Sequence, residues 1–475
     1  MSALQATAVL SGTGETPALI EISDTDPFNF GVVVNTNTLV KTFTLTNNGN
    51  IDATNLNGLA LAAPYAYEGG GAFPGSGGDC PVAGTLIPTG TCEVSVQFNP
   101  TASGFQSDDL EITYDDGVIV GKLSASELHG TGVGPAILDI SGIDPVDFGT
   151  VARDSDTEVT FTITNSGSTS ATAVTEVGLG GFYSLQGGLP GNGGTCLTTI
   201  SQGTDCTVVV NLNSPANGSP SGTLTLDYDD GTAVTANTSR TLTGTVVDPA
   251  TISISDGDPF DFNNVVSGSS VNHTFTLTNG GGVSATSLSG SGLGAPFTFS
   301  GGSFPGATGT CGVTLPVGTC TVVVTFAPTG TGLNSSTMSI NFDNGTGAIP
   351  TESNGILGTG VDPAFIEISD GPVFDYGNQP LGITISKTFT LMNSGESDAI
   401  NLGATALTAP YSFPGGAFPG GGTCTLAGSL TPTNSCTVVV DYNPTVSGAV
   451  DEVPSITYDD GLISTSAPRD IVGTG

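Results

Sequence analysis

The stretch Thr42-Phe-Thr-Leu-Thr-Asn47 decides the fold, because apolar and polar residues alternate in it with a period of two. That period is typical of a β-strand with one face toward a core and the other toward water, so Phe and Leu are expected inside and Thr outside. The stretch recurs with small changes as Thr160–Asn165, Thr274–Asn279 and Thr388–Asn393. A strand that returns in this way indicates a chain built from repeats.

The residues that flank this strand recur with it and set the boundaries of the repeats. Each repeat opens on Pro-Ala and an Ile-containing strand, as in Pro17-Ala-Leu-Ile-Glu-Ile-Ser, and ends as in Leu128-His-Gly-Thr-Gly. We therefore predict four domains, at residues 17–134, 135–248, 249–362 and 363–475. One more such ending, Leu10-Ser-Gly-Thr-Gly14, precedes the first opening. Residues 1–16 are expected to be the closing strand of a preceding repeat or a free N-terminal strand.

Other short segments of each repeat are also predicted to be strands. Val208-Val-Val-Asn-Leu and its counterparts are followed by a proline, which ends a strand ladder. Tyr114-Asp-Asp-Gly and its counterparts end in Asp-Gly or Asn-Gly, which suit tight hairpins. No segment has a convincing helical period, and about seven short strands per repeat predict an immunoglobulin-like sandwich. The predicted fold is all-β, a tandem array of four such sandwiches, and short linkers such as Val361-Asp-Pro-Ala favour an elongated rod.

The order of these motifs resembles a known family. Ile-x-Ile-Ser is followed by Phe148-Gly-Thr-Val, the Thr-Phe-Thr strand, Gly-Thr-Cys, Cys-Thr-Val-Val-Val, Tyr-Asp-Asp-Gly and the Gly-Thr ending. This order is similar to that of the Hydin-type (ASH) immunoglobulin-like repeats of bacterial surface proteins, the choice-of-anchor D domain family. The resemblance extends over residues 17–475. It implies the immunoglobulin-like fold and a role as a spacer or adhesive stalk, although a fold alone does not fix a task.

The charge of the chain excludes several classes of partner. The 475 residues include 6 Lys or Arg and 43 Asp or Glu, which gives a formal net charge of −37. Such a chain repels the phosphates of nucleic acids and the headgroups of anionic lipids. It also contains no apolar run of the roughly 18 residues that a membrane span needs. We therefore expect no nucleic-acid partner and no membrane span in this chain.

The eight cysteines fall two to a repeat at short, regular spacing. A zinc site would need four ligands, and no histidine or third cysteine lies near any pair in the sequence. We therefore predict four disulfides, within the pairs Cys80 and Cys92, Cys196 and Cys206, Cys311 and Cys320, and Cys424 and Cys436. Disulfides indicate an extracellular or cell-surface location. Residues 1–16 do not have the features of a signal peptide, so the export signal is expected outside this chain.

The acidic turns raise the question of calcium. In a seven-strand sandwich, the Asp-Asp-Gly turn is expected near the linker from the preceding repeat. At the junction of repeats 3 and 4, the predicted ligands are Asp362, Asp459, Asp460, Asp256 and Asp258, since carboxylates suit a hard cation. The alternative is that Asp-Asp-Gly is only a hairpin turn and that the acidity only keeps the surface solvated.

The sequence contains no convincing catalytic constellation. His129 and His273 each occur in one repeat only, and the paired acids recur at turns, where near-identical catalytic sites along one stalk would be unusual. We expect a protein that is not an enzyme and that requires no cofactor, with calcium as the one possible ion.

These observations predict a structural or adhesive extracellular protein, a stalk or fibre segment of a bacterial surface or matrix assembly. Its partners would be neighbouring repeats or copies of itself. One alternative is a module whose loops bind a surface glycan or protein. Its candidate residues are aromatics that either stack on a ligand or plug the core: Tyr65, Tyr67, Phe182, Tyr183, Phe297, Phe299, Tyr411 and Phe413. Another alternative is a filament subunit that assembles by strand addition through residues 1–14.

Overall fold

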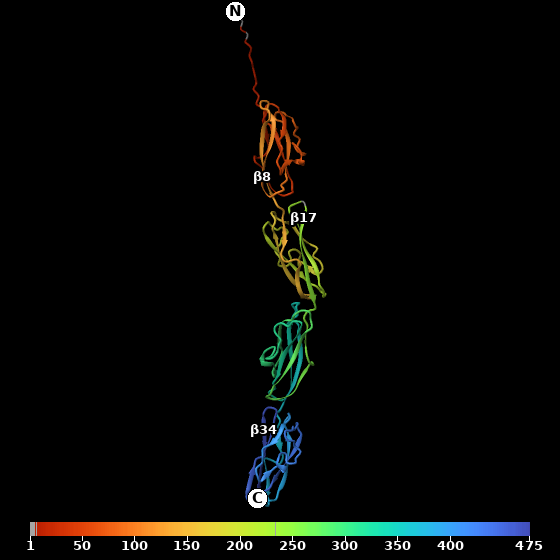
Figure 1. Cartoon of the computed structure of the whole chain (residues 1–475), viewed down its shortest axis with the longest axis vertical. Helices are drawn as coiled ribbons and strands as arrows, with labels where there is room; N and C mark the ends of the chain where they lie inside the picture. Colours follow the sequence, from red (N-terminus) through yellow and green to blue (C-terminus); the bar gives the residue numbers. More distant parts are fainter. Residues whose placement is uncertain (1–4, 6, 233) are drawn as a thin grey trace, which may run out of the picture. The chain divides into compact units, whose positions relative to one another are not determined.

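The structure, a computed structural model, describes residues 5, 7–232 and 234–475 (Figure 1). Contacts divide the chain into two compact units. One comprises residues up to 150 together with 156–246, and the other comprises residues 151–155 and 247–475. The first unit thus holds repeats 1 and 2, and the second holds repeats 3 and 4. Apart from three short 3-10 turns, η1 (Glu68–Gly70), η2 (Ser300–Gly302) and η3 (Pro414–Gly416), the regular elements of the described residues are strands.

Repeat 1 is a sandwich of two sheets. One sheet has the order β1 (Ile20–Ile22), β3 (Leu39–Asn47), β7 (Thr91–Phe98), β5 (Tyr65–Tyr67). The other has the order β2 (Phe28–Val34), β9 (Lys122–Val133), β8 (Gly104–Asp115), β4 (Ala53–Gly58), β6 (Gly84–Leu86). The strand pairs are antiparallel except β2 with β9, which is parallel.

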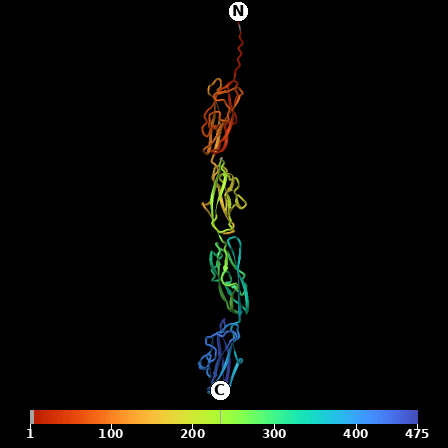
Figure 2. The same cartoon turned by 90° about the vertical axis from the view of Figure 1, so that its right-hand side faces the viewer.

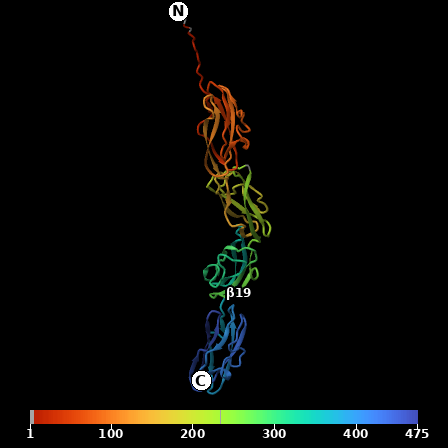
Figure 3. The ribbon, with the colours of Figure 1, turned by 45° about the horizontal axis from the view of Figure 1, so that its top comes forward.

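Repeats 2 and 3, coloured from orange-yellow to cyan in Figure 2, have the same arrangement, with a single bridge in place of β6: Ala171 with Ile200 and Ala285 with Leu315. The sheets of repeat 2 are β10 (Leu138–Ile140), β12 (Thr157–Asn165), β15 (Asp205–Leu212), β14 (Tyr183–Ser184), and β11 (Val146–Ala152), β17 (Thr235–Val247), β16 (Ser221–Asp229), β13 (Thr172–Val177). Those of repeat 3 are β18 (Ile252–Ile254), β20 (Val271–Asn279), β23 (Gly318–Phe326), β22 (Phe297–Phe299), and β19 (Phe260–Val266; labelled in Figure 3), β25 (Thr351–Val361), β24 (Gly332–Asp343), β21 (Thr286–Ser291).

Repeat 4 differs because its last hairpin is interrupted near two prolines, Pro454 and Pro468. Its first sheet is regular: β26 (Ile366–Ile368), β28 (Ile385–Asn393), β31 (Ser435–Tyr442), β30 (Tyr411–Ser412). Its second layer is split into β27 (Val373–Asn378), β35 (Asp470–Thr474), β32 (Ala449–Glu452), and β29 (Ile400–Ala404), β33 (Ser455–Asp459), β34 (Ser464–Pro468). Proline has no backbone N–H to donate to a ladder, which accounts for the break.

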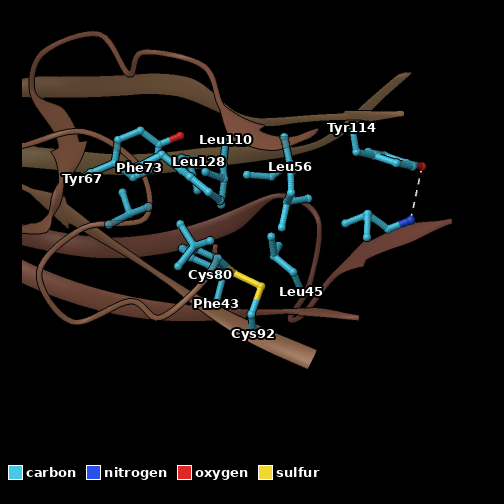
Figure 4. Packing of buried hydrophobic residues seen from close by; sticks show 14 of the residues in the cluster. Phe43, Leu45, Leu56, Tyr67, Phe73, Cys80, Cys92, Leu110, Tyr114 and Leu128 are labelled. Atoms are coloured by element: carbon cyan, nitrogen blue, oxygen red, sulfur yellow. Dashed lines mark hydrogen bonds between the residues drawn. A yellow bond between two sulfur atoms is a disulfide. The ribbon is translucent and has the colours of Figure 1, made fainter. Parts of the chain in front are cut away.

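The core of each repeat lies between its two sheets. On β3, Phe43 and Leu45 are fully buried, while Thr42 is exposed and Thr44 and Thr46 are partly exposed, as the period of two predicted. Figure 4 shows these side chains packed with Leu56, Leu110 and Leu128 from the opposite sheet. The predicted all-β tandem sandwiches are confirmed.

The N-terminal segment belongs to none of these strands. Residues 1–4 and 6 of the predicted closing strand lie outside the described residues. Residues 7–16 are exposed and are assigned to no strand, and Val9 and Leu10 are 94% and 96% exposed.

Candidate functional site

Four disulfides brace the repeats at the same place. Each joins the predicted pair, and the second cysteine of each pair lies on or beside a central strand of the first sheet, as Cys92 lies on β7. The Cα atoms of the bonded cysteines are 4.8–4.9 Å apart, within the range that unstrained disulfides adopt. The described chain has no free cysteine. These bonds tie a loop to the core strand in every repeat.

In each repeat, a buried asparagine forms hydrogen bonds at the end where the chain enters the repeat. Asn47 is fully buried; its Oδ1 accepts hydrogen bonds from the amides of Leu19 (3.2 Å) and Gly49 (3.0 Å). Its Nδ2 donates to the carbonyl groups of Ile51 and Leu86, both at 2.9 Å. Asn165, Asn279 and Asn393 make the same four bonds. The predictions from sequence gave this residue no role, although its recurrence at the end of a strand was the available signal.

The carboxylates of the Asp-Asp-Gly turns are used to form the turns. Asp460 Oδ1 accepts hydrogen bonds from the amides of Leu462 (2.8 Å) and Ile463 (2.9 Å), and Asp459 accepts one from the side chain of Asn401. That bond from Asn401 is the main reason why the pKa of Asp459 is lowered. In repeat 1, Asp116 is buried and pairs with Lys122 at 3.1 Å, and the amides of Ile119 and Val118 lower its pKa. The recurrence of these acids therefore has a structural cause.

The predicted calcium ligands do not form one cluster. Asp362 is held through its amide by Glu396 (3.0 Å), Asp256 pairs with His273, and Asp258 accepts a hydrogen bond from the amide of Gly355 (2.8 Å). Within the described ranges, no group of three or more His, Cys, Asp or Glu residues is placed to hold a metal ion. Calcium binding stays a prediction, which the melting temperature with and without millimolar calcium tests.

Three repeats carry an aspartate bonded to a basic side chain that packs on a phenylalanine ring, a lysine in two of them and a histidine in the third. Lys41 Nζ lies 2.9 Å from Asp24 and 5.1 Å from the ring centroid of Phe28. In repeat 4, Lys387 pairs with Asp370 at 2.8 Å over Phe374. In repeat 3, His273 takes the place of the lysine, 3.1 Å from Asp256, with its ring stacked on Phe260 at 3.8 Å. His273 therefore replaces the lysine of a structural pair. The second histidine, His129 of repeat 1, lies 2.8 Å from Glu127 on the same strand.

The predicted ligand-binding aromatics lie mostly inside the cores. Tyr65, Tyr67, Tyr183, Phe297, Phe299, Tyr411 and Phe413 are buried, and only Phe182 is exposed, by 40%. The ring of Tyr65 stacks on Phe98 at 4.8 Å, and Tyr411 stacks on Tyr442 at 4.9 Å. Burial raises the pKa of Tyr65 and of Tyr67 to about 12. The seven buried rings plug the cores, which was the alternative to ligand stacking.

Inside each compact unit, the turn of the later repeat meets the earlier repeat. In the first unit, Asn37 Nδ2 donates a hydrogen bond to the carbonyl of Gly231 (2.6 Å), in the Asp-Asp-Gly turn of repeat 2. A Cβ atom at Gly231 would lie 3.0 Å from Val34 Cγ2. In the second unit, a Cβ atom at Gly461 would lie 2.8 Å from Val266 Cγ2. The turns thus lie close to the preceding repeat, as the topology predicted.

Comparisons with known proteins agree with this structure for the first repeat. Residues 18–130 match the model of the HYDIN/CFA65/VesB-like, Ig-like domain family, so the resemblance to Hydin-type immunoglobulin-like repeats is confirmed. No curated protein matches the sequence. No helix of the length and apolarity that a bilayer span requires occurs in the described part of the chain.

Similar solved structures include proteins of several kinds. A protein of unknown function from Porphyromonas gingivalis W83 is 15% identical, over 48% of this chain and 100% of its own, with a TM-score of 0.20. The protocadherin GammaB4 extracellular domain is 11% identical, over 98% of this chain and 68% of its own, with a TM-score of 0.30. The ASH/PapD-like domain 7 of human CEP192 is 21% identical, over 28% of this chain and 97% of its own, with a TM-score of 0.19. These low TM-scores carry no functional conclusion.

Proposed function

Since residues 18–130 match the HYDIN/CFA65/VesB-like, Ig-like domain family, we propose that the chain is a non-enzymatic extracellular protein that works as a stalk or fibre segment. Its repeats would span distance at a bacterial surface or in a matrix, with neighbouring repeats or copies of itself as partners. The disulfide in each repeat supports an oxidising, extracellular location.

The observation that supports this proposal is the contact between the Asp-Asp-Gly turn of one repeat and the repeat that precedes it. Gly231 and Gly461 both have positive φ, +87° and +96°, and both approach a valine of the repeat before them. Glycine is needed for the backbone angle and for the close approach. A stalk requires successive repeats to keep a fixed orientation, and a tight junction of this kind restricts their rotation.

Small-angle X-ray scattering of the full chain and of Gly231→Val tests the proposal. The valine would collide with Val34, so we expect the junction to open and the distribution of particle dimensions to broaden. Gly203→Val is the matched control, because Gly203 also has positive φ (+68°) in repeat 2 but no atom lies within 4 Å of the place that its Cβ would take. Equal scattering by the two variants would contradict a role for the junction in stiffness.

Strand addition is a second candidate, favoured by one observation. Residues 10–14 carry the same Leu-x-Gly-Thr-Gly ending as the closing strand of repeat 1, yet residues 8–14 are exposed and belong to no strand. A strand with free edges can pair with another sheet. Deletion of residues 1–14 tests this candidate: loss of polymers in negative-stain micrographs would support it, and unchanged polymers would rule it out.

A further inference from the structure

A pair of perpendicular aromatic rings closes one end of the core in three of the four repeats. The pairs are Tyr67 with Phe73 (5.8 Å, 85°), Phe299 with Phe304 (5.7 Å, 90°) and Phe413 with Phe418 (6.1 Å, 87°). In each case, the second ring precedes a proline in a Gly-rich loop. The rings therefore occupy a defined place in the repeat.

The strand beside the ring pair has a small residue at the position that faces the rings. A Cβ atom at Gly58 of β4 would be 2.5 Å from Phe73, and one at Gly290 of β21 would be 2.4 Å from Phe304. The corresponding residue of repeat 4 is Ala404. The small residue and the ring pair thus depend on each other, since a larger side chain would need the same space.

Repeat 2 departs from this pattern at all three positions. Leu185 and Leu189 stand in place of the two rings, in a loop that is shorter than that of repeat 1. Glu176 of β13 stands in place of the glycine, because it pairs with Leu226 as Gly58 pairs with Ile112 and Gly290 with Ile340. Repeat 2 has therefore exchanged two rings and a glycine for two leucines and a carboxylate.

A groove of about 750 Å³ lies where the rings are missing. Its apolar lining includes Val174, Leu179, Leu185, Leu189 and Leu197, and Leu197 is 72% exposed. Glu176 is the one charged residue of the lining, and its Oε1 is held by the amide of Leu179 at 2.6 Å. The volume falls within the range of ligand pockets, which combine an apolar lining with a few placed polar groups. Repeat 1 has a smaller hollow beside its rings, about 520 Å³, with no charged residue in its lining.

We propose that this groove of repeat 2 binds a segment of a partner protein in which a basic side chain lies next to an aromatic one. The aromatic ring would fill the space that a ring of the chain itself fills in the other repeats. The basic group would meet Glu176, and the net charge of −37 would favour the approach of a cationic partner. Burial of the ring and a charge-assisted hydrogen bond to Glu176 would then act together.

Saturation-transfer and titration NMR on the full chain tests this with two small probes that share a ring and differ in charge. We expect 2-phenylethylammonium to bind saturably, and 3-phenylpropionate to bind about tenfold more weakly, as loss of a charge-assisted bond predicts. Glu176→Gln should weaken binding of the ammonium probe about tenfold. Glu158→Gln is the matched control, an exposed carboxylate on β12 of the same repeat, and should change nothing.

A second variant closes the groove without removing apolar residues. The triple change Glu176→Gly, Leu185→Phe and Leu189→Phe restores the pattern of repeats 1 and 3, and we expect it to abolish binding of the ammonium probe while the circular dichroism spectrum is unchanged. If the triple variant does not fold, the Glu176→Gln comparison alone decides. Absence of saturable binding to the native chain, equal binding of both probes, or binding unaffected by Glu176→Gln would overturn the proposal. So would preferential binding of a neutral disaccharide, which would make the groove a carbohydrate site.

Discussion

The hydroxyl group of Tyr114 accepts a hydrogen bond from the backbone amide of Ile20, 94 residues earlier in the chain and 3.2 Å away (Figure 4). The bond joins the tyrosine before the Asp-Asp-Gly turn to the opening strand of the repeat. Tyr228 and Tyr458 make the same bond to Leu138 and Ile366. The opening strand is only three residues long in each of these repeats, so one added bond is a substantial part of its attachment.

Repeat 3 has Phe342 at this position, which leads to a stabilising substitution. Phe342→Tyr should increase the free energy of unfolding of repeat 3 by about 1 kcal/mol, the usual net value of a hydrogen bond. Hydrogen exchange measured by mass spectrometry should slow in the peptide that contains Ile252. Tyr114→Phe is the reciprocal change and should speed exchange around Ile20. Unchanged exchange in both variants would contradict the role given to the hydroxyl.

The buried asparagines should be among the most sensitive positions of the fold. Asn47→Ala removes four hydrogen bonds and leaves buried amide and carbonyl groups without partners, so we expect repeat 1 to lose about 3–5 kcal/mol. Chemical denaturation, monitored through the hydrogen exchange of repeat 1, measures this loss of free energy of unfolding. The control is Asn48→Ala, since Asn48 is the exposed neighbour. A loss below about 1 kcal/mol for Asn47→Ala would show that the four bonds contribute little.

The ion pair of Lys387 and Asp370, which packs on Phe374, predicts that repeat 4 loses stability in acid. The pKa of Asp370 is lowered, first by the hydrogen bond from Lys387 and then by that from Ser369. A carboxyl group with a lowered pKa in the folded state stabilises the fold above its unfolded pKa, near 3.9, and this contribution is lost as the pH falls through the lower, folded value. The melting temperature of repeat 4 should therefore fall between about pH 4 and pH 2, and it should fall less in Asp370→Asn. Equal slopes in the two proteins would be inconsistent with this account.

Arg469 should destabilise repeat 4. Its side chain is 5% exposed beside the break between β34 and β35, and its Nε and Nη2 atoms have no hydrogen-bond partner among the described protein atoms. Burial lowers its pKa, which indicates a cost of keeping the charge. Arg469→Met should raise the melting temperature of repeat 4, with a gain of about 1 kcal/mol, because a buried charge is often replaced favourably by an apolar residue. Arg240→Met, at the partly buried counterpart in repeat 2, should have a smaller effect, because only the Nε of Arg240 is buried without a partner among the described atoms. A destabilised Arg469→Met variant would refute the inference.

Much of the fold could be predicted from the sequence because the signals are local and repeated. The alternation in Thr42–Asn47 fixes which side chains face the core, and two cysteines per repeat at short spacing indicate their pairing. The break at Arg469 was not predicted, although Pro454 and Pro468 on either side of the hairpin were a local signal for it.

The candidate sites were harder to predict because the use of a polar group depends on its partners. Asp460 has a carboxylate, as many calcium ligands do, yet one of its oxygens accepts hydrogen bonds from the amides of its own turn. The groove at Glu176 becomes visible only when the strand register aligns this residue with Gly58. The sequence does contain Glu176 in place of the glycine, but it does not show which aromatic ring fills the corresponding space in the other repeats.

The radius of gyration of the full chain in solution tests the central claim, that the repeats form a stalk, most directly. Strands of about 12 residues give each repeat a length of about 40 Å, so four repeats in line predict a radius of gyration of about 45 Å. A compact globule of this length would have a radius of gyration of about 23 Å. A value near 45 Å, with four domains in a row in negative-stain micrographs, is the result we predict. A value near 23 Å would contradict the proposed stalk.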